Sequence, residues 1–215
     1  MLLTWVLLAA NTGAGAAAVS TGEIAPATAL DAPHSLRSGL VVGLALGAGL
    51  GGASGYPNNS NQIGDPNYYS ASGWMFGSSE RLFVMGALTD YVNVGFFFGQ
   101  AAFRNGDWQS RGASGGLRIE AFPLALAYPR LSGLGASAQF GIGSGNLTAK
   151  VPGLPEAEGT QSFAAAGVLY EWPFWNVLGG HFAAGPSLDF EAMWSQPFER
   201  HGLVASGRLA FYGGP

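Results

Sequence analysis

The stretch from Gly39 to Gly52, GLVVGLALGAGLGG, constrains the fold more than any other part of the chain. The even positions from Leu40 to Leu50 are leucine, valine or alanine, whereas glycine and alanine fill the odd positions, with Val41 as the one large exception. A two-residue period over a dozen positions predicts a long β-strand with one large apolar face and one very small face.

The same stretch contains a G-x-G-x-x-G spacing at Gly47, Gly49 and Gly52, which is also found in dinucleotide-binding turns. Such a site needs a helix to begin at the glycines, with its N-terminus under the pyrophosphate. The following segment, residues 53–70, is a loop sequence rich in Asn, Gly and Pro, which disfavours that helix. We therefore expect a strand here and no dinucleotide cofactor.

Two-residue alternation recurs along the chain between turn signals. Besides the cleanly alternating segments, two others, 81–88 and 162–172, are apolar on both parities. Because Glu80 shares a parity with the apolar Leu82, we expect Glu80 at a membrane rim or beside a bulge. Together these segments predict eight strands, with a possible hairpin from 71–80 and 148–160 as the ten-strand alternative. The clean alternating segments after the first are 92–100, 115–122, 134–143, 181–194 and 202–212.

Composition indicates what surrounds these strands. The chain is 48% hydrophobic and only 10% charged, against about 25% charged residues in a typical soluble domain. After the N-terminus it has no run of roughly 18 apolar residues, which disfavours membrane-spanning helices. The remaining spanning structure is a closed antiparallel up-and-down β-barrel. A secreted soluble β-sandwich shares the two-residue period and is the alternative fold, but it would show a polar outer face on its strands.

The N-terminus predicts export. Residues 1–18 have a short apolar core and an A-x-A pattern at Ala16 and Ala18, as in a cleaved secretory signal peptide. Residues 19–36 are rich in Ala, Pro and Thr and are expected to be a flexible leader, and residues 37–215 are expected to form the barrel. The predicted localisation is an outer membrane.

Charge and residue types exclude several kinds of site. The net charge is −4, and Lys150 with eight scattered arginines forms no basic face, so no nucleic-acid partner is expected. The chain has no cysteine, and its three histidines, His34, His181 and His201, form no plausible metal set. We expect no cofactor and no metal.

Loop and aromatic positions fit a barrel with both termini on the periplasmic side. Polar, Gly/Asn/Pro-rich segments at 54–72, 104–110, 148–160 and 195–202 are expected to be the longer outer loops. The intervening inner turns, near 89–91, 128–133 and 173–180, are shorter or more apolar. Aromatic residues gather at the predicted strand ends, which predicts two interfacial girdles.

With these features the chain resembles the small outer-membrane β-barrels, of which the OmpA transmembrane domain is the familiar example. The resemblance covers roughly residues 37–212 and is architectural. The segments ASGYPNNSNQIGDPNYY and RIEAFPL are also similar to those of uncharacterised glycine-rich exported barrel proteins, a similarity that implies no activity. The chain departs from the usual pattern in ending on Gly-Gly-Pro after Tyr212.

The parity assignment directs seven charged side chains into the barrel. Because an eight-stranded barrel has an interior just wide enough for side chains, we expect a paired, structural charge network that fills the lumen. A narrow porin-like pore, altered by changes at Arg118, is the alternative. The seven residues are Arg81, Arg118, Glu120, Glu171, Asp189, Glu191 and Arg208.

We expect the protein to have a structural role or to interact with surface ligands through its outer loops, and we expect no catalysis. Tyr, Asn and Trp side chains there could contact a surface ligand, and the other expected partner is membrane lipid around a monomeric barrel. The enzymatic alternative is a deacylase-like, lipid-modifying site using His201 with Ser195 or Ser206, but the H-x-S arrangement expected of a deacylase is absent. The candidate recognition residues are Tyr56, Asn58, Asn59, Tyr68, Tyr69 and Trp108.

Overall fold

The computed structural model of the chain describes residues 37–125, 127–177 and 179–214. The signal peptide and leader expected at residues 1–36 lie outside the described residues. Within them, no helix is long and apolar enough to cross a membrane.

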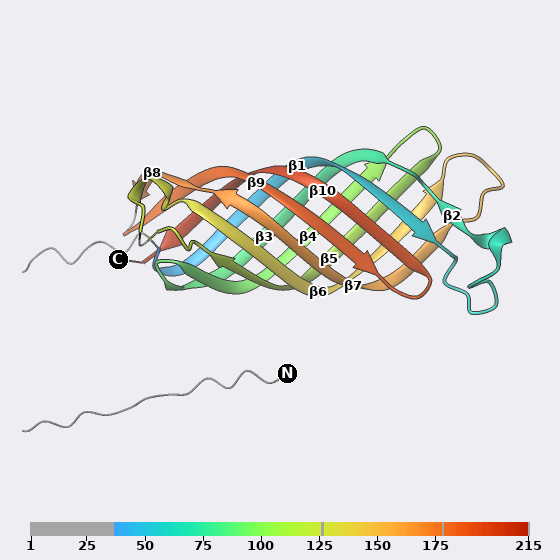
Figure 1. Cartoon of the computed structure of the whole chain (residues 1–215), viewed down its shortest axis with the longest axis horizontal. Coiled ribbons are helices and arrows are strands. Elements are labelled where there is room, and N and C mark those ends of the chain that lie inside the picture. Colours follow the sequence, from blue (N-terminus) through green and yellow to red (C-terminus); the bar gives the residue numbers. More distant parts are fainter. Residues whose placement is uncertain (1–36, 126, 178, 215) are drawn as a thin grey trace, which may run out of the picture. The chain divides into compact units, whose positions relative to one another are not determined.

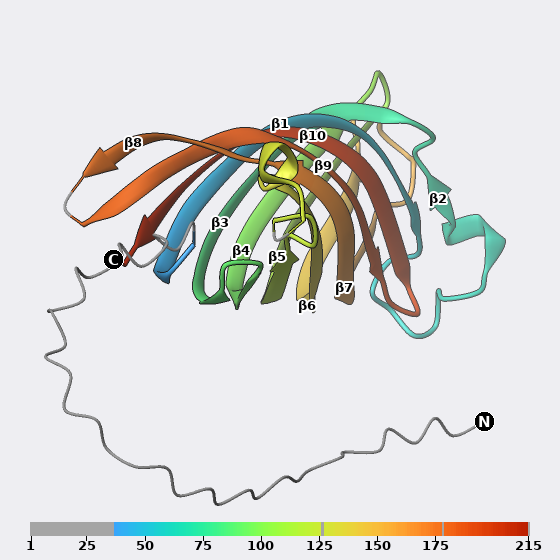
Figure 2. The same ribbon diagram turned by 60° about the vertical axis from the view of Figure 1, so that its left-hand side comes forward.

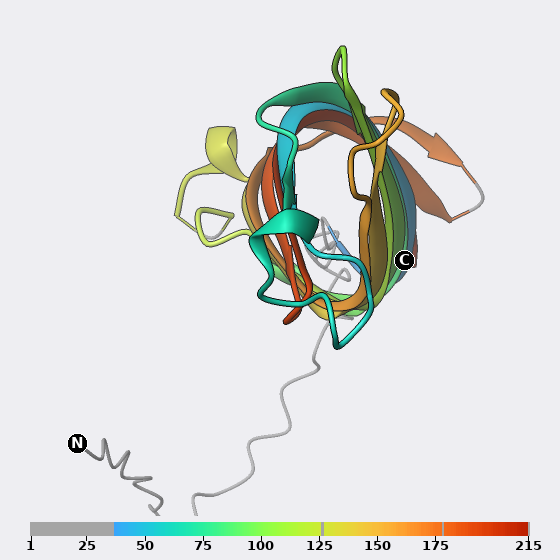
Figure 3. The same cartoon turned by 90° about the vertical axis from the view of Figure 1, so that its right-hand side faces the viewer.

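Eight antiparallel strands form a single closed sheet (Figures 1 and 3). Each strand pairs with the next one around the wall, and β10 pairs with both β9 and β1, which closes the ring. The predicted eight-stranded up-and-down barrel is confirmed, and the β-sandwich alternative is wrong because one closed sheet replaces two packed sheets. In chain order the wall consists of β1 (Gly39–Gly55), β3 (Met75–Thr89), β4 (Val92–Arg104), β5 (Trp108–Ala121), β6 (Leu134–Ala149), β7 (Ala157–Tyr170), β9 (Gly180–Trp194) and β10 (Phe198–Gly213).

The register gives the barrel its tilt. Leu82 of β3 pairs with Leu44 of β1. Followed the other way around the wall, the cross-strand partners of Leu82 run through Phe98, Gly115, Ile142, Ser162, Trp194 and Glu199 to Ser54 of β1. The ladder therefore closes with an offset of ten residues, from 44 to 54, and such a stagger requires strands inclined by roughly 40° to the barrel axis.

Two short strands lie outside the closed ring. β2 (Ser70–Ala71) pairs with the end of β1, and β8 (Trp172–Val177) pairs with the start of β9. β8 continues the line of β7 along β9, and Figure 2 shows this β8–β9 hairpin projecting beyond the other strands. The inner turn expected at 173–180 is thus largely a strand.

The wall strands are longer than the alternating segments. Residues 75–80 belong to β3, 148–149 to β6 and 157–160 to β7, so 71–80 and 148–160 form no additional hairpin. The connections at one end, which we call the loop end, are therefore 56–74, 105–107, 150–156 and 195–197, and two of them have only three residues. At the opposite, turn end the connection 122–133 is longer than these two, so the expected contrast between long outer loops and short inner turns holds only in part. The short 3₁₀ helices η1 (Pro66–Tyr68) and η2 (Pro129–Leu131) lie in the loops at opposite ends.

The two faces of the wall are as different as the alternation predicts. On β1 the even residues from Leu40 to Leu50 face outward, and all but Ala48 are large apolar side chains, whereas Val41 is fully buried. Rings from the facing strands fill the space inside: Phe83, Phe97 and Phe163 belong to one buried cluster. The small face of β1 makes room for them, because a side chain at Gly43 would overlap the ring of Phe83.

Glu80 lies in a regular part of the sheet. It is exposed on the outer wall, pairs with Leu46 and Gln100, and accepts a 3.0 Å hydrogen bond from Gln100 Nε2. The register shift in β3 occurs between Ala87 and Thr89, so the bulge alternative for Glu80 is wrong, and the membrane-rim alternative stays a prediction.

Candidate functional site

The lumen holds nine buried charged side chains among the described residues, five arginines and four carboxylates. All seven inward-pointing residues named from the sequence are among them. Each wall strand directs every second side chain inward, so charges separated by a hundred residues in the chain can meet across the barrel. The nine are Arg37, Arg81, Arg118, Glu120, Glu171, Asp189, Glu191, Arg200 and Arg208.

The cluster nearer the turn end centres on Glu120. Its carboxylate accepts hydrogen bonds from Arg118 Nε at 2.7 Å and from Arg208 Nη2 at 2.9 Å. Arg208 Nε also donates to Glu171 at 2.6 Å, and the Tyr212 hydroxyl donates to the same carboxylate at 2.7 Å. Each carboxylate therefore has charged and neutral donors at once, which is the arrangement a buried charge needs.

The second cluster lies nearer the loop end. Arg81 donates to Glu191 at 3.0 Å and lies 3.7 Å from Asp189. The hydroxyls of Ser137 and Ser187 each donate to Asp189 at 3.1 Å, so this carboxylate is bonded from β6 and from its own strand as well as paired with Arg81 on β3. The cluster therefore connects strands on different sides of the barrel.

Aromatic rings fill the space around these charges. The guanidinium carbons of Arg208 and Arg118 lie 4.4 and 5.2 Å from the centre of the Phe83 ring, within the range of cation–π attraction. Between Arg81 and Glu191 the remaining void measures only about 10 Å³, space for about one water molecule. The lumen at this level is packed with side chains.

Two lumen arginines were missed by the sequence reasoning. Arg200 was assigned to an outer loop, but it lies in β10, points inward, and donates to the Ala101 carbonyl at 3.1 Å. Arg37, the first residue of the expected barrel, was not counted among the inward-pointing charges, but it is buried, lies 3.7 Å from Glu171 and stacks over the Phe122 ring. The available signal was parity, because Arg200 lies an even number of residues from Arg208.

The outer-loop candidates lie in two different environments. Tyr56 and Tyr69 pack ring to ring, with centroids 5.2 Å apart, and Tyr68, Asn58 and Asn59 are exposed in the same 56–74 loop. The Ser70 hydroxyl bonds the Pro155 carbonyl, which ties this loop to the 150–156 loop. Trp108 differs from its prediction: it begins β5, is only 8% exposed and packs in the lumen cluster at the loop end.

The residues of the enzymatic alternative are not brought together as a catalytic pair. His201 faces outward on β10 and meets Trp74 edge to face, whereas Ser206 belongs to the inward parity. The Ser195 hydroxyl donates to the Phe198 carbonyl at 3.0 Å and closes the 195–197 turn. Within the described part of the chain, no three His, Asp or Glu side chains are grouped so that they could hold a metal ion.

Comparison with known proteins gives likeness in structure alone. No protein-family model and no curated protein sequence matches the chain. Among solved structures, it is similar to Ail, the attachment invasion locus protein of Yersinia pestis, at 10% identity over 80% of this chain and 99% of that one, with a TM-score of 0.47. It is also similar to the N-terminal β-barrel domain of Pseudomonas aeruginosa OprF, at 14% identity over 80% and 98% of the two chains, with a TM-score of 0.39.

Proposed function

We propose that the protein spans an outer membrane as a closed β-barrel and acts as a structural, surface-exposed platform that makes its contacts through the loop end. The observation that carries this proposal is the opposition of the two faces of the wall. The outer face exposes a continuous band of large apolar side chains, while the inner face holds the paired charges. A soluble barrel has no reason to expose such a band to water.

The height of the band fits a bilayer. On β1 the exposed apolar side chains run from Leu40 to Leu50. Ten steps of about 3.3 Å, inclined by roughly 40°, span about 25 Å along the barrel axis. This is the height of the apolar band in transmembrane barrels.

Aromatic side chains border the band at both ends, as interfacial anchors do. Trp74 and Trp194 are exposed near the loop end. Near the turn end Trp175 stacks on Phe182, with ring centroids 5.7 Å apart, and Phe182 packs against Phe211 at 5.0 Å. Because these rings extend onto the β8–β9 hairpin, we expect the projecting hairpin to anchor the barrel at the level of the lipid headgroups.

The packed lumen favours a platform over a pore. Nine buried charges, held by ion pairs and hydrogen bonds, lie across the interior, and the rings of Phe83, Phe97 and Phe163 occupy the space beside them. The exposed tyrosine and asparagine side chains of the 56–74 loop are the supporting feature for a recognition role at the loop end.

The first experiment is gel mobility of the membrane-extracted protein, boiled against unboiled, together with labelling of a cysteine introduced on whole cells. We expect a compact unboiled band, because a closed barrel resists mild detergent until heated. A membrane-impermeant maleimide should label Asn59→Cys in the 56–74 loop and leave Asp90→Cys at the turn end unlabelled until the cells are lysed.

Three outcomes would contradict the proposal. A protein that is soluble without detergent and shows no mobility shift is not a membrane barrel. Labelling of Asp90→Cys on intact cells would show that the turn end, and not the loop end, faces the outside of the cell. Steady single-channel conductance that changes with Arg118→Ala would favour the pore.

A further inference from the structure

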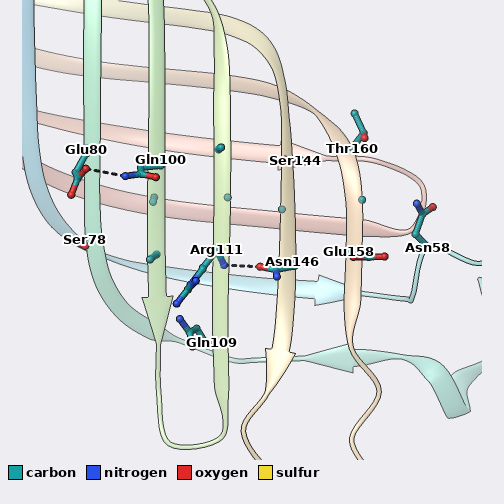
Figure 4. Close-up of a pocket in the computed structure, with 16 residues that line it drawn as sticks. Asn58, Ser78, Glu80, Gln100, Gln109, Arg111, Ser144, Asn146, Glu158 and Thr160 are labelled. Carbon is teal, nitrogen blue, oxygen red and sulfur yellow. Dashed lines mark hydrogen bonds between the residues drawn. The ribbon is translucent and has the colours of Figure 1, made fainter.

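The outer wall carries a polar hollow that the lumen and the loops do not explain. It has a volume of about 750 Å³ and lies over β3 to β7 (Figure 4). Apart from Asn58 of the 56–74 loop and the inward-facing Ala101, the side chains that line it share the outward orientation of Leu82 and Phe98, so the hollow is outside the barrel. The backbone of Gly112, Gly145 and Gly159 also borders the hollow, although a Cβ at Gly112 or Gly145 would point into the lumen.

Cross-strand register arranges the lining in two rows, which we call the polar rows. The first row contains the hydrogen-bonded pair of Glu80 and Gln100, and the second contains Arg111, whose backbone N–H donates to Asn146 Oδ1 at 3.2 Å. Since five neighbouring strands contribute to each row, the polar rows are a feature of the folded wall. The first row is Glu80, Gln100, Ala113, Ser144 and Thr160, and the second is Ser78, Ala102, Arg111, Asn146 and Glu158.

The rows directly below are apolar except for Ser162 of β7. Leu82 pairs with Phe98, and in the next row Phe96, Leu117 and Phe140 are joined in register and exposed. Along β3, β4 and β6 the wall thus changes from hydrocarbon-like to polar within two residues, at Leu82 and Glu80, Phe98 and Gln100, and Ile142 and Ser144. A molecule that covers both parts must itself be amphiphilic, with acyl chains toward the turn end and a polar headgroup toward the loop end.

The chemistry of the polar rows restricts the headgroup. Amide, hydroxyl and carboxylate groups dominate, and the charged side chains are Glu80, Glu158 and Arg111, two negative against one positive. Headgroups rich in phosphate are bound by clustered arginine or lysine, which is absent from these rows. Uncharged hydroxyls, by contrast, can donate to the carboxylates and accept from the amide and guanidinium groups.

We propose that the polar rows bind the sugar headgroup of an outer-leaflet glycolipid whose acyl chains lie on the apolar rows below. This inference rests on the proposed function, because the band must lie in a bilayer for the hollow to reach the headgroup level. It also explains how Glu80 and Gln100 are accommodated at the margin of the band, since a charged side chain facing hydrocarbon is destabilising there.

The test measures lipid retention by native mass spectrometry of the purified barrel, in a detergent with a tetraethylene glycol headgroup that carries no sugar. The probes are dioleoyl glucosylglycerol, dioleoyl phosphatidylglycerol and dioleoylglycerol, which share their acyl chains. We expect the glucosyl lipid to bind at least about tenfold more tightly than the other two. The variant Asn146→Leu/Thr160→Val, which removes two hydrogen-bonding groups, should weaken its binding by about tenfold, which corresponds to about 1.4 kcal/mol.

The matched control is His201→Leu, which replaces an exposed polar residue on the outer wall of β10, outside the hollow, and should bind the glucosyl lipid as the unmodified protein does. Gln100→Leu is the second variant and is used if the double variant does not assemble. It removes one amide from the polar rows and extends the apolar band, so the strand should still fold. A boiled against unboiled gel of each sample shows whether the barrel has formed.

Equal binding of phosphatidylglycerol, or unchanged binding in both hollow variants, would overturn the inference. Displacement of the lipid by water-soluble methyl glucoside at a similar concentration would show that a free sugar is the ligand, and a dimer that disappears in the variants would show that a second copy covers the hollow. If any of these results is found in samples with a normal mobility shift, the protein is still a membrane barrel, and only the inference of a glycolipid ligand is rejected. Loss of the mobility shift in the unmodified protein rejects the proposed function instead.

Discussion

At the scale of single residues, Glu120 carries the greatest share of the lumen network. It is fully buried and accepts hydrogen bonds from Arg118, Arg208 and Asn93. Both arginines are themselves nearly inaccessible to water, and Arg118 is compensated by this carboxylate, whereas Arg208 is shared between Glu120 and Glu171. Removing one partner of a buried pair leaves an uncompensated charge, which destabilises more than the intact pair stabilises.

We therefore predict that Glu120→Gln lowers the free energy of unfolding by about 3–5 kcal/mol, although the amide has nearly the same shape. The measurement is urea unfolding in lipid vesicles, followed by tryptophan fluorescence. The matched control is Glu199→Gln: Glu199 is exposed and bonded to Ser54, and its change should cost less than about 1 kcal/mol. Similar losses in both variants would show that Glu120 has no special role.

At the scale of elements, β1 and β10 meet through small residues. A Cβ at Gly43 would overlap the Phe83 ring and also approach the Leu209 carbonyl. Gly207, on the outer face of the neighbouring strand, has nothing within 4 Å of such a Cβ. The glycine-rich inward parity of β1 is thus a packing requirement of the rings that fill the lumen.

The prediction at this scale compares Gly43→Ala with Gly207→Ala. Overpacking at residue 43 should destabilise the barrel by about 1–3 kcal/mol, whereas the methyl group at residue 207 enters open space and should be tolerated. The midpoint of urea unfolding and the temperature at which the compact gel band disappears both report the difference. If the two variants unfold alike, Phe83 has moved aside at no cost and the packing argument fails.

The described barrel taken together has one apolar band around its outer wall, between two polar ends. The band is about 25 Å high on β1, but on β3 to β7 it is bounded at the loop end by the polar rows. A band of given height is most stable in a bilayer of matching thickness, because mismatch costs a fraction of a kcal/mol per ångström.

We predict that the free energy of unfolding has a maximum in vesicles whose hydrocarbon thickness is about 25 Å, and that it falls in both thinner and thicker bilayers. Saturated or monounsaturated phosphatidylcholines of increasing chain length provide the series, and urea unfolding provides the measurement. Stability that is independent of chain length would show that the apolar band does not contact the hydrocarbon core.

The kind of strand and the face on which each side chain lies can be predicted from the order of the residues alone. Alternation from Leu40 to Leu50 predicts an apolar outer face, and the same parity reasoning directed Arg118 and Glu120 inward, where the structure buries both. The physical reason is local: side chains alternate sides along any strand, so the contrast between lipid-like and small or polar residues is visible in one dimension.

Where the strands end and which side chains meet become known from the folded barrel. Beyond the apolar band the contrast between the faces disappears, so the sequence does not show that β5 already begins at Trp108 or that Arg200 still lies in β10. Pairs such as Arg81 with Glu191 depend on strand order and on the ten-residue stagger at closure. These are properties of the closed ring, because a cross-barrel contact is fixed by register around all eight strands and not by any one of them.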